Sequence, residues 1–173
     1  MTEIIWHGRG GQGAFTAARL LGEAYSFNDG AYALAFPSFG PERRGAPIRA
    51  FTKLDTKPVG NRSEVKKADF SIFLDDTLYT DAALQELKEG GRILLNTRKR
   101  IDSPSVITVD ADSIAEKYLG LPITNTILLG VLAAAGGVVS VEDICKAIEL
   151  SMPERLSAKN TAAVRAAYEE VKA

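Results

Sequence analysis

Short runs of β-branched and aromatic residues alternate with helical segments through the first two thirds of the chain. The helical segments, where apolar residues recur at helical spacing, are expected over 14–24, 81–88 and 110–118. Gly90-Gly91 is expected to close the second helix, and Asp110 to cap the third. The extended runs predict strands over 2–7, 32–36, 48–54, 70–74, 92–95 and 106–109.

The last third of the chain has a different pattern. From residue 124 onward the strand signals stop, and Ser140 with Asp143 resembles a capping box. Three more helices are expected, over 124–135, 141–150 and 157–171.

Strands that alternate with helices and then give way to a helical end favour an α/β fold in one domain, residues 1–173. We expect a three-layer α/β/α arrangement with a mostly parallel but mixed open sheet and a helical C-terminal segment. The runs at 32–36 and 48–54 are expected to pair antiparallel, because their connection is too short for a parallel crossover.

Composition supports a compact domain and excludes several partners. Hydrophobic residues make up 46% of the 173 positions and charged residues 25%. The 21 Lys and Arg nearly balance the 22 Asp and Glu, so the net charge of -1 gives no field that would attract nucleic acid or anionic lipid. The longest apolar stretch, 127–139, is shorter than the ~20 residues of a membrane span. Met1 leads directly into the first strand without a signal sequence, so we expect a cytoplasmic protein with no membrane partner.

The first candidate site is a glycine-rich turn between the first predicted strand and helix. Glycines let backbone amides approach a phosphate, and the N-terminus of the following helix adds partial positive charge. The turn has the G-x-G-x-x-G spacing, with the sequence Gly8-Arg9-Gly10-Gly11-Gln12-Gly13.

A dinucleotide-binding turn also requires an acidic residue about 20 residues further on, at the end of the second strand. Here that strand ends in Ala35-Phe36-Pro37, and Asp29 precedes it. Three interpretations therefore remain open: binding of NAD or FAD, contact with the phosphate of another ligand, and a purely structural turn.

The second candidate site is the connection between the second and third strands, residues 37–47. Its three prolines and two glycines exclude a regular helix or a central strand. It carries Glu42, Arg43 and Arg44, and arginine forks suit protein interfaces as well as carboxylates and phosphates. We favour an interface over a ligand site, and a ligand site over an exposed ion pair.

Other reactive side chains are more simply structural. His7 ends a buried strand and no nucleophile motif accompanies it. Cys145, inside an amphipathic helix, is expected to be a small core residue. The pair Asp75-Asp76 could bind a metal, but a helix cap and a solvated loop are favoured because no histidine or further carboxylate accompanies it. No catalytic residue and no metal ligand is therefore assigned to this chain.

The two candidate sites together resemble one known family. The turn at 8–13 and the segment Phe36-Pro37-Ser38-Phe39-Gly40-Pro41-Glu42-Arg43-Arg44-Gly45-Ala46-Pro47 are similar to the gamma subunit of 2-oxoacid:ferredoxin oxidoreductases. The second segment is the more specific of the two. The resemblance extends over nearly the whole chain, through residues 51–58 and 125–130 to Asn160 and Tyr168.

This resemblance implies a division of labour among subunits. Thiamine diphosphate with Mg and the iron–sulfur clusters would belong to partner alpha, beta and delta subunits, and the gamma chain would hold no cofactor. One cysteine agrees with this, because a cluster held by thiolates normally needs four. The implied reaction is oxidative decarboxylation of a 2-oxoacid to an acyl-CoA, with electrons passed to ferredoxin. The residue Arg43 favours the pyruvate or branched-chain branches, since methionine is expected there in the 2-oxoglutarate branch.

Two hypotheses about residue roles follow. Gly8, Gly10, Gly11, Gln12 and Gly13 would receive the phosphates of coenzyme A, a co-substrate, and the arginine pair would dock the chain against its partners. The isolated subunit is expected to be able to pair with itself. The rival functions are a free-standing NAD- or FAD-binding domain and a purely structural subunit.

Overall fold

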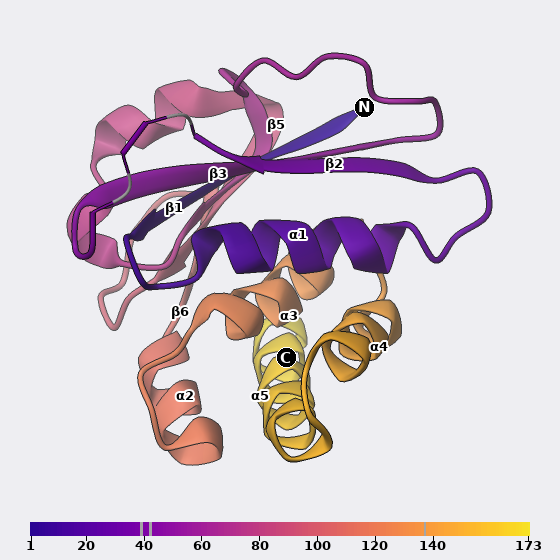
Figure 1. The fold of residues 1–173 in the computed structure, drawn as a ribbon. Helices are drawn as coiled ribbons and strands as arrows, with labels where there is room; N and C mark the ends of the chain where they lie inside the picture. Colours follow the sequence, from indigo (N-terminus) through magenta and orange to yellow (C-terminus); the bar gives the residue numbers. More distant parts are fainter. Residues whose placement is uncertain (39, 42, 137) are drawn as a thin grey trace.

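The computed structural model describes residues 1–38, 40–41, 43–136 and 138–173. These residues form one mixed six-stranded sheet in the order β2-β3-β1-β4-β5-β6 (Figure 1). The α/β fold with a helical C-terminal end is confirmed. The strands are β1 (Thr2–Arg9), β2 (Tyr32–Pro37), β3 (Pro47–Asp55), β4 (Ala68–Phe73), β5 (Leu87–Asn96) and β6 (Val106–Val109).

Strand β1 lies inside the sheet, between β3 and β4. It pairs antiparallel with β3 from Thr2 opposite Leu54 to Arg9 opposite Pro47, and parallel with β4. The pairs β4–β5 and β5–β6 are also parallel, whereas β2 and β3 are antiparallel as expected. The carboxyl ends of β1, β4, β5 and β6 consequently meet at one edge of the sheet.

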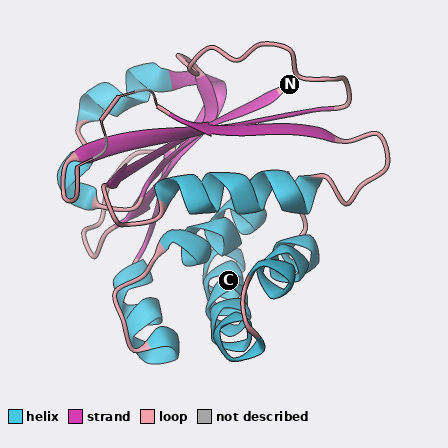
Figure 2. Cartoon of the chain, in the orientation of Figure 1, coloured by secondary structure: helices cyan, strands magenta, loops and turns pink. Residues whose placement is uncertain are grey.

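All the α-helices of the described residues lie on the same face of the sheet, beneath it in Figures 1 and 2. Their side chains share a core with Ile4, Trp6, Ile72 and Leu94, which point to that face. No helix in the described ranges is both long and apolar enough to cross a membrane. The helices are α1 (Ala14–Tyr25), α2 (Ala111–Leu119), α3 (Asn125–Gly136), α4 (Val141–Ser151) and α5 (Glu154–Lys172).

The opposite face is covered by a thinner layer. Two 3-10 helices, η1 (Asp76–Leu78) and η2 (Asp81–Glu86), lie there. Phe73 and Ile93 form a second cluster with Ala83 of η2. The sheet is thus enclosed on both faces, but only one face carries long helices.

The helix expected over 81–88 is wrong in type and extent. The segment is a 3-10 helix that ends at Glu86, and β5 begins at Leu87, which pairs with Ala68. Gly90-Gly91 therefore lie inside a strand, where the register of β4 against β5 shifts, instead of closing a helix. A Cβ atom on Gly91 would be 2.8 Å from the Ala68 carbonyl oxygen, so this irregular pairing requires glycine.

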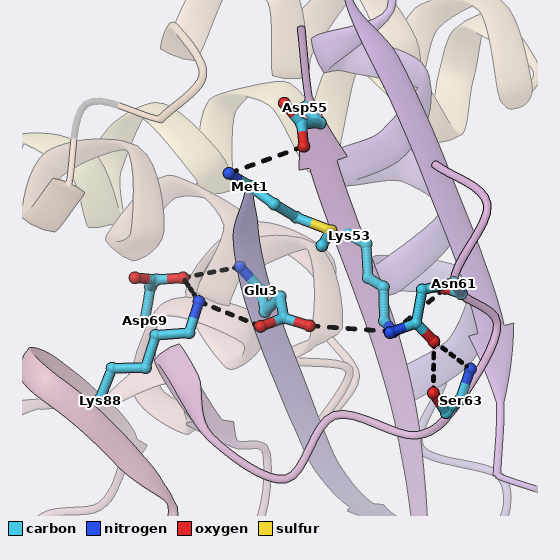
Figure 3. A network of polar contacts seen from close by, with 8 residues as sticks. All are labelled: Met1, Glu3, Lys53, Asp55, Asn61, Ser63, Asp69 and Lys88. Atoms are coloured by element: carbon cyan, nitrogen blue, oxygen red, sulfur yellow. Dashed lines mark hydrogen bonds and ion pairs between the residues drawn. The ribbon is translucent and has the colours of Figure 1, made fainter. Parts of the chain in front are cut away.

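A polar network joins the amino-terminal strand to its neighbours (Figure 3). Lys53 Nζ, on a side chain only 1% exposed, lies 3.8 Å from Glu3 Oε1 and donates to the Asn61 carbonyl at 3.1 Å. Lys88 Nζ contacts Glu3 Oε2 at 3.0 Å and Asp69 Oδ2 at 2.8 Å. Burial alone would lower the pKa of Lys88, but hydrogen bonds and the negative charges of Asp69 and Glu3 outweigh it and raise that pKa. One carboxylate, Glu3, thus compensates two lysines.

Candidate functional site

The two candidate segments of the sequence, 34 residues apart at Gly10 and Arg44, meet in the structure. Gly10 and Arg44 form a parallel β-bridge. The Gly10 amide donates to the Ala46 carbonyl at 2.8 Å, and the Gly45 amide donates to the Gly10 carbonyl at 3.0 Å. The glycine turn (residues 8–13) and the arginine loop (residues 37–47) are therefore fastened backbone to backbone.

Two glycines of the turn are required by close approach. A Cβ atom on Gly10 would collide with the Arg43 carbonyl, with the Arg43 carbonyl carbon at 2.9 Å. Gly13 has φ +82 and is the N-cap of α1, and a Cβ there would lie 2.5 Å from Asn125 Nδ2. Glycine at these positions therefore lets the arginine loop and α3 approach the turn closely.

Arg9 connects three segments and was not singled out by the sequence. Its guanidinium donates to the Gly45 carbonyl at 3.0 Å and to Thr77 Oγ1 at 2.9 Å. Its Nε lies 3.3 Å from Asp75 Oδ2. The signal that could have identified it is its position inside the turn, where a long donor reaches the next strand end as well as the loop.

Gln12 braces the turn from within. Its Oε1 accepts the Arg9 amide at 2.7 Å, and its Nε2 donates to Asp75 Oδ2 at 3.0 Å. Asp75 also accepts from the Thr77 amide and caps η1, which confirms the cap expected from the sequence. Burial alone would raise the pKa of Asp75, but the hydrogen bonds from Thr77 and Gln12 and the charge of Arg9 hold it below its ordinary value.

Only some of the backbone amides in the glycine turn are free to donate hydrogen bonds to a ligand. In the described part of the chain, the amides of Arg9, Gly10 and Gln12 already donate within the protein. The amides of Gly11 and Gly13 have no internal acceptor there, and neither does the first turn of α1, as at any helix N-terminus. Gly11 has φ +93 and is exposed. These amides and the N-terminus of α1, with its partial positive charge, lie beside the arginine loop.

Arg43 and Arg44 have exposed side chains, and neither forms an ion pair with another described residue. Glu42, named with them as a candidate, lies outside the described residues. The surface around the turn therefore presents two guanidinium groups from a loop that is pinned at Gly10.

A polar crevice of about 830 Å³ adjoins the turn at the carboxyl ends of β1, β4 and β5. The sequence signalled its acidic part, Asp75 and Asp76, but not its basic part, Arg98 and Lys99. The Asp76 carboxylate already accepts a hydrogen bond within the protein, from Thr97 Oγ1 at 2.6 Å. The described residues contain no group of three or more His, Cys, Asp or Glu that could hold a metal.

His7 and Cys145 lie where structural residues are expected. The His7 ring stacks on Phe73 with centroids 4.2 Å apart, and its Nε2 lies 2.8 Å from Glu86 Oε2. Cys145 is buried in the main core, and burial raises the pKa of its thiol. Neither side chain reaches the glycine turn.

Comparison with known proteins decides the family. Residues 3–170 match the family model described as pyruvate ferredoxin/flavodoxin oxidoreductase. The chain belongs to this family. Within it, the chain is a gamma-type subunit, as its similarity to the following proteins shows.

A pyruvate synthase subunit PorC of Methanothermobacter marburgensis is 45% identical over 175 residues, covering 99% of this chain and 98% of the relative. A common gamma subunit of the pyruvate/ketoisovalerate oxidoreductases of Thermococcus litoralis is 44% identical over 180 residues, covering 98% and 97%. The crystal structure of the pyruvate oxidoreductase subunit PORC of Thermotoga maritima matches with a TM-score of 0.84 at 37% identity, covering 97% of this chain and 95% of that one.

The topology of this gamma-type subunit also argues against a dinucleotide fold. A dinucleotide fold places two parallel strands side by side, joined by the helix that follows the glycine turn. Here the strand that follows α1 is β2, and β3 separates it from β1. Among the described residues, β1 therefore has no adjacent parallel strand joined to it through α1, and the acidic residue at the end of the second strand is missing as well.

Proposed function

We propose that this chain is the gamma subunit of a cytoplasmic complex that oxidatively decarboxylates a 2-oxoacid, pyruvate in the first place, to an acyl-CoA. Ferredoxin would accept the electrons. Thiamine diphosphate, Mg and iron–sulfur clusters would lie on alpha, beta and delta subunits. The gamma chain would be a scaffold with a coenzyme A contact and would have no activity alone.

The observation that carries the proposal is the attachment of the arginine loop to the glycine turn through Gly10. This attachment brings two kinds of hydrogen-bond donor that can bind an anion onto one surface. One kind is the backbone amides of Gly11, Gly13 and the first turn of α1, and the other is the guanidinium groups of Arg43 and Arg44. Coenzyme A carries phosphates, which both helix N-termini and arginine forks bind. Coenzyme A would supply the acyl-accepting thiol, and this chain would hold its phosphates.

The preference for pyruvate has separate support. The curated relatives are named for pyruvate, or for pyruvate and ketoisovalerate. Arg43 stands where methionine is expected in the 2-oxoglutarate branch. Turnover of the purified complex with pyruvate, ketoisovalerate and 2-oxoglutarate tests this preference, and a higher kcat/KM for 2-oxoglutarate would overturn it.

The coenzyme A contact is tested by Gly11→Val in the assembled complex. A Cβ there would lie 3.8 Å from Arg44 Cγ, and a side chain is disfavoured at φ +93, so this change would alter the surface shared by the turn and the arginine loop. We expect the KM for coenzyme A to rise about tenfold or more, and the reaction steps that precede coenzyme A binding to keep their rate. Gly30→Val is the matched control, because Gly30 has φ +70, open space around it and lies in another loop. An unchanged KM for coenzyme A in the Gly11→Val variant would contradict the proposed contact.

Docking through the arginine pair is tested separately by the double change Arg43→Ala, Arg44→Ala. If these guanidiniums bind only coenzyme A, the complex still co-purifies and the KM for coenzyme A rises. If they dock a partner subunit, the chain is lost from the complex. Co-purification with an unchanged KM would remove both roles and leave a structural subunit.

A further inference from the structure

A groove between the α2–α3 connection and the start of α5 carries chemistry that the glycine turn does not use. Its volume is about 450 Å³, and apolar side chains form most of its lining. Three of them are strongly exposed: Leu121 at 58%, Ile123 at 45% and Leu156 at 52%. Large apolar side chains gathered at one mouth mark a site that something covers. We call this site the α2–α5 groove.

One residue that lines the groove has a buried hydrogen-bond acceptor without a partner among the described residues. Asn125 lines it and is only 6% exposed. Asn125 Nδ2 donates to the Gly13 carbonyl at 3.3 Å, so the amide orientation leaves Oδ1 as an acceptor. Among the described residues, Asn125 Oδ1 is the buried side-chain polar atom without a partner. Asn125 thus joins the groove to the glycine turn, since it lines the one and contacts the other.

The positive charge of the groove indicates what kind of molecule binds there. Arg155 and Lys159 line it, and no acidic side chain of the described residues does. A second copy of this chain docking about a two-fold axis through the groove would bring the same cations close to one another, which is repulsive. A small molecule held in the groove would leave the three apolar side chains at the mouth exposed. A protein segment with apolar and acidic side chains would cover them and neutralise the cations.

We infer that the α2–α5 groove is a docking surface for a partner subunit, which inserts an apolar side chain flanked by Asp or Glu. This surface lies next to the glycine turn, because Asn125 contacts Gly13. The inference requires only that the chain works within a complex. It does not depend on coenzyme A binding at the turn or on which 2-oxoacid is used.

The first test places a photo-crosslinking amino acid at Leu121 or Leu156 in the purified complex. We expect both positions to label one segment of one partner subunit, with acidic residues beside the labelled apolar residue. Thr56, exposed in the connection between β3 and β4 and absent from the groove lining, is the control position and is expected not to label that segment. Labelling of a second copy of this chain, labelling of a segment without acidic residues, a co-purified small molecule in the groove or no labelling in an intact complex would each overturn the inference.

The second test reverses the charges with Arg155→Glu, Lys159→Glu. We expect the Kd for the partner subunits to rise at least about tenfold and the salt dependence of binding to change. The double change Lys57→Glu, Arg62→Glu reverses two exposed charges in another loop and is the matched control. In whatever complex forms, the KM for coenzyme A is expected to stay at its wild-type value, which separates this docking surface from the glycine turn. An unchanged Kd would contradict the inference.

Discussion

The side-chain amide of Gln12 donates a 3.0 Å hydrogen bond to Asp75 Oδ2. This bond joins the glycine turn to the carboxyl end of β4, across 63 residues of sequence. Arg9 reaches the same carboxylate oxygen, at 3.3 Å from its Nε. The shape of the turn is therefore fixed by a neighbouring strand end as well as by its own glycines.

Asp75→Asn tests this support through pH. The folded-state pKa of Asp75 is lowered, so its contribution to stability is present above the pKa of the unfolded chain, about 3.9, and is lost as pH falls through the folded pKa. We expect Asp75→Asn to lower the free energy of unfolding by about 1–2 kcal/mol at pH 7. Urea unfolding at several pH values should show the difference from wild type shrinking below about pH 4. A difference that does not change with pH would contradict the charged interaction.

Gly10→Ala tests the fastening of the arginine loop. The added methyl group would collide with the Arg43 carbonyl, so the bridge to the loop must open. We expect a loss of about 1–3 kcal/mol in the free energy of unfolding. Exchange of the Gly45 amide hydrogen is expected to accelerate, because that amide donates to Gly10. Gly60→Ala, with open space around it, should leave both measurements near wild type.

The sequence predicted the elements better than the contacts between them. Each of the six strands was expected near its observed position, because alternating or continuous apolar runs report burial directly. The 3-10 helix at η2 was mistaken for an α-helix, because the local residues suit both and the pairing of Leu87 with Ala68 is a tertiary constraint. Both halves of the candidate site were identified from glycine, proline and arginine. The contact between the two halves at Gly10 could not be predicted from the sequence, since a backbone bridge does not depend on a recognisable side chain.

The roles of Arg9 and Asn125 were missed for a related reason. Arg9 occupies a variable position of the glycine spacing, so the motif assigns it nothing, and its partners lie 36 and 68 residues away. Asn125 was noted only as part of a resemblance. Its Oδ1 can be identified as unpaired only in the structure, where the Gly13 carbonyl accepts from Nδ2 and so defines the orientation of the amide. Long-range polar contacts of this kind depend on the packing of the whole fold.

Glu3→Gln tests the network that holds β1 against β3 and β5. Removing this charge leaves buried Lys53 without its ion pair and weakens the contact to Lys88. We expect a loss of about 2–4 kcal/mol, measured by chemical denaturation, because an uncompensated buried ammonium is costly. Lys53→Met removes the buried charge itself and should cost less than Glu3→Gln. The opposite order would show that the lysine is compensated by its carbonyl contact to Asn61 and not by Glu3.

The last prediction compares two glycines that both lie within helices but have different surroundings. Gly130 of α3 packs against the backbone of α5, and a Cβ there would lie 3.0 Å from the Val164 carbonyl carbon and closer still to its oxygen. Gly22 of α1 would place a Cβ 3.4 Å from the Ala33 methyl group, which is an ordinary contact.

Gly130→Ala should therefore separate α3 from α5 and lower the free energy of unfolding by about 3 kcal/mol or more, since rigid backbone cannot yield as a side chain does. Gly22→Ala should be neutral or stabilising by up to about 1 kcal/mol, because alanine is the better helix former. Thermal and urea unfolding of the two variants against wild type measure both effects. If the two changes had the same effect on stability, the close approach of α5 would not be the reason for the glycine at position 130.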